Sequence, residues 1–101
     1  MAKYMIRASY TAEGAKRLLA DGASKRREVA QGLVEGLGGT VEAFYFCFGS
    51  DDLIVIVDVP DNVRAAAASL AVNSGGVVSS STTVLLTTEE MDQATQVDTS
   101  Y

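Results

Sequence analysis

Four side chains are the candidates for contact with a small ligand: Arg7, Tyr10, Phe46 and Asp58. Arg7 lies within an apolar segment, where a charged side chain is costly unless it is paired. It therefore either contacts an anionic ligand or forms half of an inter-subunit ion pair. Tyr10 stands where an alternating segment opens into a turn, so its hydroxyl can point into the mouth of a cavity. Asp58 stands near the end of an apolar run, where exposure to solvent is the alternative to lining a cavity.

The absence of histidine excludes several kinds of chemistry. The chain can hold no histidine-based triad and no imidazole metal ligand, and its single cysteine offers no Cys pair for zinc. No P-loop and no GxGxxG motif is present. The glycine-rich segment Gly36-Leu37-Gly38-Gly39 precedes a strand instead of opening a helix, so it is expected to end a helix and not to bind phosphate. We therefore expect no metal and no cofactor, and we assign no catalytic residue. Cys47 is expected to be a small core hydrophobe, and Asp51-Asp52 to belong to a turn.

Charge and hydropathy limit the partners. The net charge of −5 argues against binding to nucleic acid, which usually needs a clustered basic face. The basic cluster Lys25-Arg26-Arg27 is explained by a solvated helix face. No apolar run approaches the roughly 20 residues that cross a bilayer, and the first ten residues do not resemble a signal peptide. A lone cysteine is typical of a reducing compartment, so we expect a cytoplasmic protein with no membrane contact.

The hydrophobic pattern predicts a regular order of elements. Residues 3–10 alternate as a strand, and Thr11 caps a helix that is interrupted at Asp21-Gly22 and ends at Gly38-Gly39. The later elements are strands over 40–48 and 52–59, a helix capped by Asp61, a strand over 77–86 with the run Ser79-Ser80-Ser81-Thr82-Thr83, and a short helix after a capping box at Thr87–Glu90. The hydroxyl-rich run suggests an edge strand, part solvated and part paired with another subunit.

This β-α-β-β-α-β order predicts an α+β, ferredoxin-like fold, a four-stranded antiparallel sheet with both helices on one face. Residues 1–94 would form a single domain, and residues 95–101 a frayed tail. The other face of the sheet would still be apolar, with Met5, Phe44, Phe46, Phe48, Ile54 and Ile56, or their counterparts one residue along. Because such a patch is unusual on a monomer, we expect two sheets to pair in a homodimer, with a higher oligomer through the hydroxyl-rich edge.

The hairpin segment FYFCFGSDDLIVIVDVPD, over residues 44–61, carries a family resemblance. With YMIRASYTAEGAKRL before it and a Thr-rich strand and TTEEM after it, the chain over residues 3–91 resembles the GYD-domain family. The resemblance implies the dimeric α/β-barrel form of the ferredoxin-like fold, but no particular activity. The family's naming motif has a tyrosine where this chain has Asp51, so a chemical role of that tyrosine would be lost here.

Three functions remain open. The first is a small oligomeric protein that binds an apolar or anionic molecule, in a pocket that also holds Arg7, Tyr10 or hydroxyls of the last strand. The second is a cofactor-independent monooxygenase or isomerase, in which a shifted carboxylate or the substrate itself would act as the base. The third is a structural or regulatory assembly module without a ligand. A pocket of several hundred cubic ångströms would favour the first two, and a dry, packed interface the third.

Overall fold

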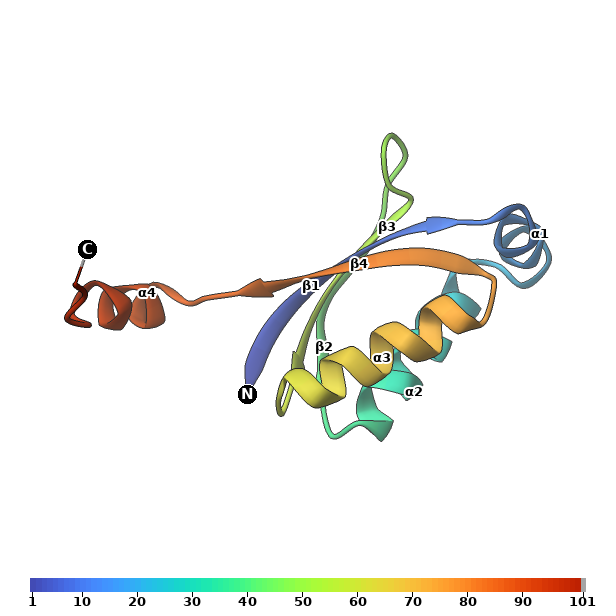
Figure 1. Cartoon of the computed structure of the whole chain (residues 1–101). Helices are drawn as coiled ribbons and strands as arrows, with labels where there is room; N and C mark the ends of the chain where they lie inside the picture. The colour runs from blue at the N-terminus through green and yellow to red at the C-terminus, as the bar shows by residue number, and fades with distance from the viewer. Residues whose placement is uncertain (101) are drawn as a thin grey trace.

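The computed structural model describes residues 1–100, which form four strands and four helices (Figure 1). In chain order these are β1 (Ala2–Tyr10), α1 (Ala12–Asp21), α2 (Ala23–Gly36), β2 (Thr40–Phe46), β3 (Leu53–Val59), α3 (Asn62–Ser74), β4 (Val78–Leu85) and α4 (Thr88–Thr95). The predicted order of elements is confirmed, and the last three strands are one or two residues shorter than the sequence predicts at one or both ends. The boundary predicted at residue 94 stays a prediction, and Tyr101 of the predicted tail lies outside the described residues.

The strands form one antiparallel sheet in the order β2-β3-β1-β4. The chain is therefore an α+β protein with a four-stranded antiparallel sheet. β1 and β3 are the central strands, paired from Ala2 with Val59 to Ala8 with Leu53. The Ser/Thr-rich strand β4 lies at one edge, as its two hydroxyl-bearing faces predict.

Local hydrogen bonds explain where the helices begin. The Thr11 hydroxyl accepts from the Gly14 amide at 3.1 Å, and the Asp61 carboxylate accepts from the Arg64 amide at 3.0 Å. Thr87 and Glu90 form the reciprocal capping box that the sequence predicts. All three predicted N-caps are thus confirmed, and short-range sequence signals set these boundaries.

Helices α2 and α3 lie along the same face of the sheet, which we call the helix face (Figure 1). The core lies between them and strands β1 and β3, and its buried members are Tyr4, Ala8, Val34, Leu53, Val55, Val57 and Val59. The Tyr4 hydroxyl, although it belongs to a core residue, donates a hydrogen bond to the Asn62 side chain of α3. This bond satisfies a polar group that would otherwise destabilise the core.

The opposite face, which we call the open face, is not covered by α2 or α3. Met5 pairs with Ile56 there, and both side chains are half-buried. Phe44 and Phe46 do not lie on this face, because they pair with Val55 and Leu53 and point with them toward the helix face. Their counterparts Ala43 and Tyr45 occupy the open face instead. A register shift between Val41 and Ala43 determines which residues of β2 face the helices, so the sequence periodicity alone does not determine it.

Helices α1 and α4 lie outside this two-layer body. α1 extends beyond the end of β1, and α4 lies at the far end of the chain beyond β4, with none of its residues buried (Figure 1). Gly22, with φ of 85°, separates α1 from α2, a backbone conformation that glycine adopts without strain. Within residues 1–100, no helix has both the length and the apolar character that a bilayer crossing requires.

Candidate functional site

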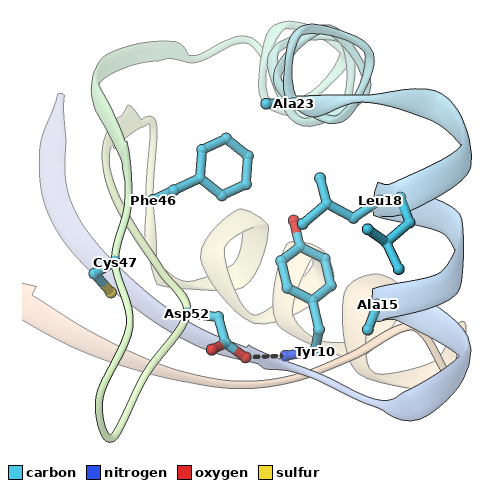
Figure 2. A pocket seen from close by; sticks show the side chains of 8 residues that line it. Tyr10, Ala15, Leu18, Ala23, Phe46, Cys47 and Asp52 are labelled. Carbon is cyan, nitrogen blue, oxygen red and sulfur yellow. Dashed lines mark hydrogen bonds between the residues drawn. The ribbon is translucent and has the colours of Figure 1, made fainter.

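A cleft of about 690 Å³ opens between α1, the start of α2, the end of β1 and the β2–β3 hairpin. Its walls are mostly apolar, and they consist of Tyr10, Ala15, Leu18, Leu19, Ala23, Phe46, Cys47 and Asp52. Figure 2 shows the side chains of Tyr10, Leu18 and Phe46 directed into the same space from three different elements. Clefts of this volume, with apolar walls and a few polar groups, are typical of small-molecule sites.

The first turn of α1 holds one wall of the cleft against the sheet. The Thr11 amide donates to the Val77 carbonyl at 3.0 Å, and the Thr11 hydroxyl donates to the Gly76 carbonyl at 2.7 Å. Gly14 lies against the same Val77 carbonyl, and a Cβ there would also stand only 2.9 Å from the Tyr10 ring. The absence of a side chain at Gly14 therefore lets α1 approach Tyr10 closely.

Asp52 joins the hairpin to the end of β1. Its carboxylate accepts a hydrogen bond from the Tyr10 amide at 2.8 Å (Figure 2), and its own amide donates to the Ala8 carbonyl at 2.9 Å. The sequence predicts only that Asp52 belongs to a turn, but its side chain bonds a residue 42 positions away. This long-range bond fixes Tyr10 relative to Phe46, and no local pattern could have indicated it.

The phenol of Tyr10 is the main polar group inside the cleft. Burial raises its pKa above the ordinary value of 10.0; the nearby Arg26 lowers the pKa by less, and Asp52 adds a smaller increase. Tyr10 is therefore neutral near pH 7. In this state its hydroxyl can donate a hydrogen bond to a ligand and accept one.

The other two candidate residues lie on the open face, away from the cleft. Arg7 is bonded through Nε to the Asp51 carboxylate at 3.1 Å, and its side chain is 47% exposed. The Asp58 carboxylate accepts from Lys3 at 3.0 Å, and Lys3 also contacts Glu42. Of the four candidates, the structure thus brings together Tyr10 and Phe46 only. Arg7 has an ion-pair partner within its own chain, where the sequence suggested one in another subunit.

Several residues of the cleft were not found from the sequence. The sequence indicates Leu18 and Leu19 only as part of a helix, and it predicts Cys47 in the core, whereas Cys47 is half-buried in the cleft wall. Arg26 was assigned to a solvated face. Arg26 does not line the cleft, but its side chain is only 17% exposed. It lies four and eight residues before Ala30 and Val34, so the inward stripe of α2 could have indicated its burial.

No metal centre is apparent in the described part of the chain, since nowhere in it do three His, Cys, Asp or Glu side chains gather. The cleft offers one carboxylate, one thiol and one phenol among apolar walls. This set of groups suits an organic ligand better than a cation.

Comparison with known proteins identifies the chain by family. Neither the curated proteins nor the solved structures contain a significant match. The family model described as the GYD domain matches residues 4–95 of the 101-residue chain. This match confirms the resemblance that the hairpin segment carries, and it includes all of the sheet except its first two residues. The chain therefore belongs to the GYD-domain family.

Proposed function

We propose that this protein binds a small, mainly apolar molecule in the cleft between Tyr10 and Phe46, and that it does so as a homodimer. The observation that carries the proposal is the cleft itself, about 690 Å³ in volume with apolar walls from α1, α2 and the hairpin. Leu19 is 87% exposed at its margin, a large apolar side chain that a ligand would remove from water. A cleft of this size favours a ligand-binding protein over an assembly module without a ligand.

The polar groups of the cleft support binding ahead of catalysis. The Tyr10 phenol has a raised pKa, so it is not poised as a base near neutral pH, and the Asp52 carboxylate holds the Tyr10 amide by a hydrogen bond. A cofactor-independent monooxygenase or isomerase would need a shifted carboxylate, or the substrate itself, as its base. The free Cys47 in the cleft wall is in keeping with a reducing, cytoplasmic location.

The dimer proposal rests on the open face of the sheet. Met5, Ile54 and Ile56 lie there half-buried, and Tyr45 is 70% exposed beside them. The strand order β2-β3-β1-β4 with its β-α-β-β-α-β connections supports a ferredoxin-like fold. Pairing two such sheets face to face, as a dimeric α/β barrel, would cover the apolar residues of both copies.

Binding of the neutral, apolar fluorophore N-phenyl-1-naphthylamine would test the cleft. We expect saturable binding to the wild-type protein, with fluorescence enhancement on transfer from water. Phe46→Ala should weaken this binding about tenfold, because it removes a large apolar contact.

Phe48→Ala is the matched control, since Phe48 is 98% exposed at the tip of the same hairpin and does not line the cleft. It should change the affinity less than about twofold, a fraction of one tenfold step in binding. Circular dichroism would verify that both variants are folded. Equal binding to the two variants, or no saturable binding to the wild-type protein, would contradict the proposal.

A further inference from the structure

Helix α4 has no packing surface within its own chain. It has eight residues, none of them buried, and it lies beyond the end of β4, away from α2 and α3 (Figure 1). Isolated helices shorter than about 12–15 residues are marginal in water. The capping box of Thr87 and Glu90 satisfies the first turn of α4, but it does not replace packing. A helix of this length therefore calls for a surface that its own sheet does not offer.

The side chains of α4 indicate what that surface should be. Met91, which is 51% exposed, and Ala94 lie three residues apart and so share one side of the helix. Val97, just past the end of the helix, is 64% exposed. The helix also carries three acidic side chains and no Lys or Arg. A surface that complements α4 should thus combine apolar and basic side chains.

The outer side of α1 combines these properties. Leu19 is 87% exposed at the margin of the cleft, and Lys16, three residues earlier on the same side of the helix, is also exposed. Lys16 forms no ion pair within residues 1–100. Residues 12–28 hold five of the eight Lys and Arg residues against three acidic ones, in a chain whose net charge is −5. α1 therefore complements α4 in charge and offers it an apolar contact.

The α1 of the same chain lies out of reach of α4. β1 pairs with β4 from Lys3 opposite Leu85 to Tyr10 opposite Val78, so α4 and α1 leave these strands at opposite ends (Figure 1). Seven strand residues span about 23 Å, at about 3.3 Å each. Two extended residues and four helical ones carry Met91 at most about 13 Å from Leu85. The α1 of a second copy must therefore supply the contact.

The proposed dimer can bring these two ends together. A two-fold axis that runs across the strands sets the strands of the two facing sheets antiparallel, so that the α4 end of each copy lies beside the α1 end of the other. We infer that α4 of each copy packs across α1 of the other, with Met91 against Leu19 and the acidic side chains beside Lys16. The partner's helix then covers the margin of the cleft, and both copies complete each ligand site. This inference rests on the proposed dimer and specifies its orientation.

Photo-cross-linking of the whole chain would test the contact. p-Benzoylphenylalanine in place of Met91 should yield a covalent dimer on irradiation. Mass spectrometry of mixed ¹⁴N- and ¹⁵N-labelled protein should find its cross-links in α1 of the other copy. The same probe in place of Val63, which is 74% exposed on α3, is the matched control and should yield little covalent dimer. Cross-links confined to the probe's own chain, or to the open face of the other copy, would overturn the inference.

A double-mutant cycle would test the same pairing by its energy. Met91→Lys and Leu19→Asp should each weaken dimerisation about tenfold, measured by sedimentation equilibrium, because each places a charge in an apolar contact. The double variant should be weakened by much less than the product of the two effects, since the introduced charges are opposite. The two residues lie at opposite ends of one chain, so a coupling between them reports a contact between copies.

Val63→Asp replaces Leu19→Asp in the control cycle, where the effects should multiply, and circular dichroism would verify that every variant is folded. Unchanged dimerisation of Met91→Lys, or effects that multiply in both cycles, would overturn the inference and leave the proposed dimer standing. A wild-type protein that is monomeric at micromolar concentration would contradict the inference and the dimer together. Binding of N-phenyl-1-naphthylamine would still test the cleft separately.

Discussion

The two faces of the central strand β3 are both apolar, yet they differ in what covers them. Leu53, Val55, Val57 and Val59 are buried against α2 and α3, while the alternate residues Ile54 and Ile56 on the open face are only half-buried. The sequence LIVIV does not distinguish the two faces. The difference teaches that apolar character predicts a covered sheet, whereas the position of the helices decides which side the chain covers with its own residues.

The largest effect should come from placing a charge on each face in turn. Val57→Asp puts an unpaired carboxylate among buried residues, and the cost of several kcal/mol approaches the whole stability of a domain of this size. We therefore expect it to be largely unfolded by circular dichroism. Ile56→Asp on the open face should keep its secondary structure but lose the proposed dimer, measured by analytical ultracentrifugation.

A second variant keeps the assembly test decisive. Tyr45 is 70% exposed on the same face, so Tyr45→Glu can disrupt the proposed dimer without disturbing the packed part of the sheet. A wild-type protein that is monomeric at micromolar concentration, or a Tyr45→Glu variant that is dimeric like the wild type, would show that the open face is not the interface. The two faces would then differ in solvent exposure but not in assembly.

A smaller effect on stability is expected from removing a tyrosine hydroxyl on each face. Tyr4 is 2% exposed on the helix face, and Tyr4→Phe removes its hydrogen bond to Asn62 and leaves the amide oxygen without that partner. We expect a loss of about 1 kcal/mol in the free energy of unfolding, which lowers the melting temperature by roughly 4–8 °C. Urea denaturation and thermal unfolding would both measure it.

Tyr45→Phe is the control on the open face, examined in the Ile56→Asp background so that assembly does not contribute. Its hydroxyl has no such bond within the described chain, and the change should lie within about 0.5 kcal/mol. Equal losses for Tyr4→Phe and Tyr45→Phe would contradict the assignment of Tyr4 to a hydrogen-bonded position in the core.

The elements of this fold were predictable because their signals are local. Thr11, Asp61 and Thr87 cap helices through contacts three residues away, and the hydroxyl-rich strand β4 lies at the edge that its composition indicates. The faces of β2 were not predictable, because a register shift after Val41 places Phe46 on the helix face.

The cleft was predictable only in part. Tyr10 was expected at a cavity mouth from its place at a strand end, and it lines the cleft. The walls of the cleft depend on contacts between segments that are far apart in the sequence. Gly14 packs closely against the Val77 carbonyl, and the Asp52 carboxylate accepts a hydrogen bond from the Tyr10 amide. No pattern of periodicity or capping reports such pairings.

The smallest effect concerns two titrating groups, one on each face. On the helix face, burial raises the pKa of Tyr10 above 10.0; on the open face, hydrogen bonds from Lys3 to Glu42 and then Asp58 raise the pKa of Lys3 above 10.5. Both pKa shifts change the free energy of unfolding with pH in the same direction. Above the ordinary pKa the unfolded chain releases its proton first, so stability falls as the pH rises through the higher folded value. Tyr10→Phe and Lys3→Met should each reduce this alkaline loss, measured by urea denaturation between about pH 9 and pH 11, a range that spans both ordinary values.

The response to salt should distinguish the causes of the two pKa shifts, burial for Tyr10 and hydrogen bonds to carboxylates for Lys3. Raising the ionic strength from about 0.1 M to 1 M shortens the screening length from about 10 Å to 3 Å, which weakens ion pairs that solvent reaches. The Lys3 side chain is 35% exposed and that of Glu42 is 49% exposed, so the pKa of Lys3 should move back toward 10.5. The pKa of Tyr10 should respond less, because salt does not restore the water that burial removes. Titrations of ¹⁵N-labelled lysine and ¹³C-labelled tyrosine at the two salt concentrations would measure both. Equal responses would mean that charge, and not burial, governs Tyr10, and that the two faces do not differ in the way their packing indicates.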